Sequence, residues 1–87
     1  MEKSVLLVLI NNRKESAEKV QKILTGWGCI IKTRLGIHDG VLENCSDHGL
    51  IFLELVGESP KHEELMHKIK LIKGVDAKLV SLQVESE

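Results

Sequence analysis

The chain has 87 residues, of which 43% are hydrophobic and only 2% aromatic, and its 12 basic and 13 acidic residues give a net charge of −1. This length fits a single domain, residues 1–87, with a small core of Leu, Ile and Val. A nucleic-acid groove needs a clustered basic face and rings on which bases can stack. Because the chain has no clustered basic face and only one Phe and one Trp, we expect no direct binding of nucleic acid.

The opening segment and the cysteine content favour a cytoplasmic protein. The longest apolar run, residues 5–10, is far shorter than the ~20 residues that a membrane span requires. The first four residues do not resemble a secretory signal, and two cysteines are too few for a disulfide framework. We therefore expect reduced thiols, no contact with a membrane and a cytoplasmic location.

The first half of the chain predicts a strand, a helix and a second strand. Residues 4–11 are almost continuously apolar and predict a strand. A capping box of Asn12 and Glu15 marks the start of an amphipathic helix that runs to Gly26. The second strand is predicted at residues 30–37.

The second half repeats this order. A strand is predicted at residues 49–56, and a helix follows with Ser59 as its N-cap and Pro60 at its first position. Gly74 ends the helix, and residues 75–84 predict a fourth strand. Two successive β-α-β units predict an α+β ferredoxin-like fold, a βαββαβ sandwich with two helices on one face of an antiparallel sheet.

The composition of the strands predicts their order and an exposed face. Residues 4–11 and 49–56 are the more apolar strands, which places them in the centre of a sheet of order 4-1-3-2. Along both of them, apolar side chains alternate to both faces of the sheet, although two helices can cover only one. We therefore expect a second copy to cover the other face, giving a homodimer or a tetramer; the alternative is a monomer whose loops fold over it.

Several motifs resemble a known family, the iron-only hydrogenase system regulators. They are Asn11-Asn-Arg-x-x-x-Ala-x-Lys-Val-x-x-Ile-Leu-x-x-x-Gly28, Ile30-Ile-x-x-Arg-x-Gly-Ile37 and, more loosely, residues 50–57 and 72–75. The resemblance implies an ACT-like fold, oligomerisation through the sheet and a regulatory role. It also implies a relation in fold to the sensor domain of the nickel-responsive repressor, whose DNA-binding arm has no counterpart in this sequence. Residues 38–48 depart from the short, Arg-containing connection of the family.

Residues 38–48, which connect the second and third predicted strands, carry the candidate metal ligands. His38, Cys45 and His48 offer nitrogen and sulfur atoms suited to zinc or nickel. Their spacing matches no established metal signature, so the alternative is an exposed polar connection. On the second helix, His62 and His67 are about 140° apart and cannot bind one ion from the same face. His62 lies at the edge of the apolar stripe of this helix and His67 faces solvent, so we expect both to be structural or surface residues.

A second candidate site lies between the first strand and the first helix. Asn11, Asn12 and Arg13 precede a helix N-terminus, where free amides favour an anionic group, and Arg34 could add charge. The resemblance to ACT-like domains implies a small-molecule effector here, but these effector loops usually carry an Asp and a Gly that this chain lacks. The alternative is a capped helix with solvated cations.

Three functions remain after these exclusions. Cys29 is expected to be a small, partly buried residue, and we find neither a positioned nucleophile nor a phosphate loop, so we expect no enzyme activity. The first hypothesis is an oligomeric sensing module that binds a small ligand or a metal at loops between subunits. The alternatives are a protein–protein interaction module without a ligand and, from the His/Cys cluster alone, a metal-storage protein.

Overall fold

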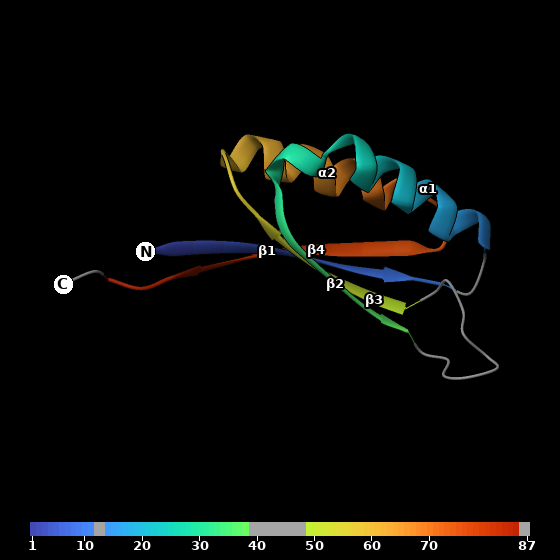
Figure 1. Ribbon diagram of the computed structural model, residues 1–87, viewed down its shortest axis with the longest axis horizontal. Helices are drawn as coiled ribbons and strands as arrows, with labels where there is room; N and C mark the ends of the chain where they lie inside the picture. The colour runs from blue at the N-terminus through green and yellow to red at the C-terminus, as the bar shows by residue number, and fades with distance from the viewer. Residues whose placement is uncertain (12–13, 39–48, 86–87) are drawn as a thin grey trace.

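The computed structural model describes residues 1–11, 14–38 and 49–85, except for the side chain of His38. The elements follow in the order β1 (Glu2–Ile10), α1 (Lys14–Gly26), η1 (Gly28–Ile30), β2 (Ile31–His38), β3 (Gly49–Leu55), α2 (Ser59–Lys70) and β4 (Val75–Gln83). The strands form one antiparallel sheet of order β2-β3-β1-β4, with both helices on the same face (Figure 1). The predicted ferredoxin-like fold and strand order are confirmed.

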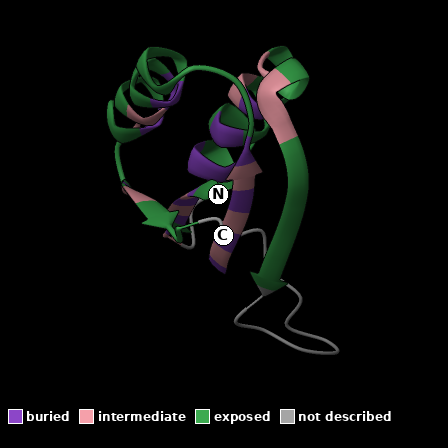
Figure 2. Ribbon diagram, turned by 90° about the vertical axis from the view of Figure 1, so that its left-hand side faces the viewer, coloured by how far each residue is buried: buried purple, intermediate pink, exposed green. Residues whose placement is uncertain are grey.

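The core lies between the sheet and the two helices. Alternate residues of the central strands face the helices, and the most deeply buried side chains in the structure include Leu6, Leu53, Leu65 and Ile69. Figure 2 shows the resulting stripes of buried residues along the strands and on the inner sides of the helices. The alternation follows from the two-residue period of a strand, which places every second side chain on the same face.

The start of α2 differs by one residue from the prediction. Ser59 is the first helical residue and Glu58 is the N-cap, with no hydrogen bond from its side chain. The carbonyl of Glu58 accepts from the amides of Lys61 at 3.0 Å and His62 at 3.4 Å, so the helix is closed through the backbone. Pro60 fits this first turn because it has no amide that needs a partner.

Two other details concern the ends of elements. The 3-10 turn η1 was not predicted, and the capping-box residue Asn12 lies outside the described residues. In the described part of the chain, no helix has the length and apolar character needed to cross a membrane.

Candidate functional site

The face of the sheet that is turned away from the helices is apolar over most of its area. We call it the open face. The paired residues Leu7 and Phe52, and Leu9 and Leu50, form its centre on the two middle strands. Its apolar members are Val5, Leu7, Leu9, Leu35, Ile37, Leu50, Phe52, Val80 and Leu82.

The open face is exposed to solvent in this structure. Leu9 and Leu35 are both 56% exposed, Ile37 is 48% exposed and Leu82 is 62% exposed, while the other five members are half-buried among their neighbours. Large contiguous apolar patches are rare on soluble monomers and usually mark an interaction site. The five members on β1 and β3 belong to the two strands for which the sequence predicted an uncovered apolar face, and the four members on β2 and β4 were not predicted.

A charged cluster interrupts one end of the open face. Lys3 Nζ donates to Glu54 Oε2 at 3.1 Å, and the hydroxyl of Thr33 donates to Glu54 Oε1 at 3.4 Å. The hydrogen bond from Lys3 is the main cause that lowers the pKa of Glu54, and partial desolvation opposes it. The carboxylate is therefore held ionised and paired, and a surface that covered it would meet an ion pair instead of a lone charge.

The predicted ligand-binding residues at the β1–α1 junction are only partly described. Asn12 and Arg13 lie outside the described residues. Asn11 is half-buried, and its amide donates to the carbonyl of Gly74 at 2.9 Å, which ties the end of β1 to the α2–β4 turn.

Arg34 does not lie near this junction. It pairs with Leu53, which pairs with Leu6, so Arg34 is two strands away from β1 and level with its middle. Its guanidinium donates to the side chain of Gln21 on α1. The structure therefore does not bring Arg34 and Asn11 together, and a ligand site that uses both stays a prediction.

The predicted metal site falls on residues that the structure does not describe. Cys45 and His48 lie outside the described ranges, and His38 is described only as the last residue of β2. Among the described residues, no three His, Cys, Asp or Glu side chains are placed to hold a metal ion. Binding of zinc or nickel by this set stays a prediction.

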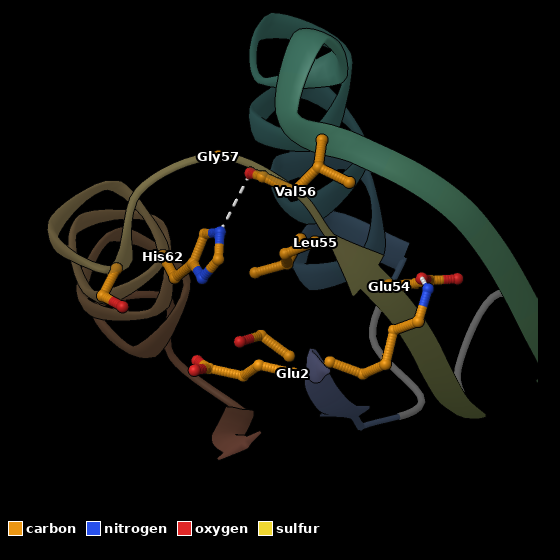
Figure 3. Close-up of a pocket in the computed structure, with 9 residues that line it drawn as sticks. Glu2, Glu54, Leu55, Val56, Gly57 and His62 are labelled. Carbon is orange, nitrogen blue, oxygen red and sulfur yellow. Dashed lines mark hydrogen bonds and ion pairs between the residues drawn. The ribbon is translucent and has the colours of Figure 1, made fainter. Parts of the chain in front are cut away.

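A polar hollow of about 400 Å³ lies at the opposite end of the sheet from the β1–α1 junction, between the start of β1 and the start of α2 (Figure 3). His62 is buried on its wall, and the Nε2 of its ring is bonded to the carbonyl of Val56 at 2.9 Å. The sequence placed His62 at the edge of the apolar stripe of α2, and this structural role agrees with that expectation. His67 is exposed, also as expected.

Sequence reasoning missed two side chains. Ser16 is buried, and its hydroxyl donates to the carbonyl of Lys73 at 2.9 Å, linking α1 to the α2–β4 turn. A serine inside a helical pattern gives no sign of such a contact. The expectation that Cys29 is partly buried was wrong, because η1 turns this residue outward and exposes it.

The chain matches no family model and no curated protein. Its fold resembles that of TM1266, an uncharacterized protein from Thermotoga maritima, with a TM-score of 0.78 and 25% identity over 95% of the chain and 100% of that protein. It also resembles the leucine response regulatory protein LrpA of Mycobacterium tuberculosis, with a TM-score of 0.55 and 10% identity over 95% of the chain but only 51% of LrpA.

A third similarity is weaker. CPII, a nitrogen regulatory PII-like protein from Thiomonas intermedia K12 whose structure holds ADP, AMP and bicarbonate, matches with 18% identity over 99% of the chain and 94% of CPII. Its TM-score is 0.48, which is too low to support an inference about ligands. The first two similarities agree with the ferredoxin-like fold, and neither of them names a function for this chain.

Proposed function

We propose that this chain is a non-enzymatic regulatory module of the ACT-like kind that assembles with a second copy of itself through the open face. The observation that carries this proposal is the open face itself, because nine apolar side chains from all four strands lie on the side of the sheet that neither α1 nor α2 covers. The resemblance of the sequence to the iron-only hydrogenase system regulators supports the regulatory part.

A second copy is the simplest partner for this surface. Two sheets that pack face to face bury their apolar sides at a spacing of about 10 Å, and a two-fold axis brings the same patch from both copies together. Lys3 neutralises Glu54 at one end of the patch, so that packing of two copies does not bury an unpaired carboxylate there.

The regulatory step in this proposal is a change in assembly. A ligand that binds more tightly to one oligomeric state than to another shifts the population toward that state. The loops that we propose for this ligand, a small molecule or a transition metal, are residues 11–14 and 38–48. The alternative proposal is an interaction module that uses the same face and binds no ligand.

The experiment is to place a charge on the open face. Leu35 is 56% exposed, so Leu35→Glu changes the folded subunit little but would bury a carboxylate in a face-to-face dimer. We expect the wild type to sediment as a dimer or a larger species and Leu35→Glu to sediment as a smaller species than the wild type, with far-UV circular dichroism unchanged.

The matched control is Leu71→Glu. Leu71 is 86% exposed and follows α2, away from the open face, so this variant should sediment like the wild type. A wild-type monomer at micromolar concentration, or a Leu35→Glu variant that assembles as the wild type does, would contradict the proposal.

A further inference from the structure

The outer edge of β4 carries backbone groups whose direction can be worked out from one pair of residues. Met1 and Val84 exchange two backbone hydrogen bonds, each of 2.8 Å. In an antiparallel ladder such pairs alternate with pairs that make no bond to each other. Because the register from Glu2–Gln83 to Ile10–Val75 has no shift, the odd-numbered residues of β4 direct their N–H and C=O groups away from β1.

This outer edge is closed over its first half and open over its second. The amide of Val75 donates to the carbonyl of Ile72 at 3.2 Å, and the amide of Ala77 donates to Asp76 Oδ1 at 2.9 Å. The next three outward-facing residues, Leu79, Ser81 and Gln83, have no backbone partner on that side in the part of the chain that the structure describes.

The other edge of the sheet is protected by different means. β2 contains a register irregularity between Ile31 and Thr33, and it carries Lys32 and Arg34. Bulges and cations are the devices by which edge strands avoid pairing with another chain. The second half of β4 has neither, since residues 79–84 are uncharged and their ladder to β1 is regular.

The helices do not obstruct this part of the edge. Ser81 pairs with Ser4, which lines the same hollow as Ser59 and His62 at the start of α2. Ser81 is therefore level with the beginning of that helix. The start of β1 and the end of β4 extend past the ends of both helices (Figure 1).

We propose that the open half of β4 pairs with the same segment of a second copy, antiparallel and about a two-fold axis at Ser81. In this register Ser81 lies opposite Ser81 of the partner subunit, and Leu79 lies opposite the partner's Gln83. The capped amide of Ala77 falls opposite the partner's Glu85, past the end of its strand. The N–H and C=O groups that pair in this register are therefore those of Leu79, Ser81 and Gln83, which have no backbone partner on that side among the described residues.

The position of α2 selects this register over one centred on Ala77. With the axis at Ser81, the two α2 helices begin near the axis and run in opposite directions. An axis at Ala77 would place them side by side above strands about 4.8 Å apart, whereas packed helices need about 8–10 Å between their axes. An axis at Ala77 would also require the amides of Val75 and Ala77 to donate to the partner subunit, although both already donate to acceptors within their own subunit.

The side chains of this register agree with a self-contact. Val80 lies opposite the partner's Leu82 on the side of the open face, and Lys78 lies opposite the partner's Val84, so no like charges face each other. The open faces of the two copies join into one apolar surface across the new strand pair. The edge contact does not depend on the face-to-face contact, and the two together produce a tetramer.

A disulfide trap tests the register directly. In a background of Cys29→Ser and Cys45→Ser, Ser81→Cys would place two thiols on the axis, where Cα atoms of a hydrogen-bonded pair are about 5.5 Å apart and a disulfide can form. The control is Gln83→Cys, whose two copies lie about 13 Å apart along the strands. We expect mild oxidation of dilute protein to link Ser81→Cys many times faster than Gln83→Cys, as read by intact mass. Equal rates, or no linkage of Ser81→Cys, would overturn the proposal.

A proline variant separates the edge contact from the open face. The amide of Gln83 points outward, so Gln83→Pro removes no bond within the subunit, whereas Leu82→Pro removes a bond to β1 and should lower the melting temperature. We expect Gln83→Pro to keep the far-UV circular dichroism of the wild type and to reduce a tetramer to a dimer. A tetramer that persists in Gln83→Pro would overturn the edge contact. A Leu35→Glu variant that loses the tetramer but keeps the Ser81→Cys linkage would show that the two contacts are distinct.

Discussion

Gly74 joins the α2–β4 turn to the end of β1, and its position does not tolerate a side chain. Its φ is +82°, in the left-handed region that favours glycine, and an added Cβ would overlap the side-chain amide of Asn11. The backbone bond between Asn11 and Gly74 holds the same two segments together. The end of β1 therefore has a structural role next to the predicted ligand site.

We predict that Gly74→Ala lowers the free energy of unfolding by about 1–3 kcal/mol, the usual cost of a strained backbone position. Gly36→Ala is the control, because Gly36 lies in β2 with open space around it and no positive φ. That variant should be neutral or stabilising by a few tenths of a kcal/mol. Urea unfolding of both variants checks this, and equal midpoints would show that Gly74 is not strained.

Glu54 couples stability to pH through its ion pair with Lys3. Its pKa is lower in the folded protein than its usual value of 4.5, so the carboxylate stabilises the fold above that value, and this contribution is lost as the pH falls through the lowered pKa. We predict that Glu54→Gln unfolds at a lower urea concentration than the wild type at pH 7 and that the difference is smaller at pH 3. Glu63→Gln is the control, because Glu63 is exposed and has no ion pair among the described residues. A difference that is the same at both pH values would contradict this account.

At the scale of elements, α2 is held by a small number of buried side chains. Leu65 and Ile69 are fully buried, while Leu71, just past the end of the helix, is 86% exposed. We predict that Leu65→Ala lowers the free energy of unfolding by about 2–5 kcal/mol, since it removes buried methyl groups and leaves a cavity. Leu71→Ala should change it by less than about 0.5 kcal/mol. Thermal unfolding of the two variants checks the contrast, and similar losses would mean that α2 packs differently.

The elements themselves could be predicted because their apolar periods are clear. The alternation of Leu6, Val8 and Ile10 with Leu7 and Leu9 determines both the strand and its two faces. The start of α2 at Ser59 and the turn η1 could not be located to the residue, because Glu58 is bonded through its backbone and η1 has no apolar period of its own.

At the scale of the whole molecule, the sequence predicted the open face but not the arrangement of the ligand residues. The open face could be predicted because two helices cover only one face of a four-stranded sheet, and the two central strands carry apolar residues on both faces. Whether Arg34 lies near Asn11 depends on the strand order and on the register across β3, the strand that lies between β2 and β1. Which residues of different strands lie side by side depends on how the strands pair in the folded protein. It cannot be predicted from the distance between Arg34 and Asn11 in the sequence.

The central claim is that the open face is covered by a second copy, and native mass spectrometry of untagged protein, purified without a chelator, tests it most directly. We predict a dimer or a tetramer for the wild type and a species with fewer subunits for Leu35→Glu. Any additional mass on the assembly would also report a bound metal or small molecule. A wild-type protein that remains a monomer at micromolar concentration would contradict the account.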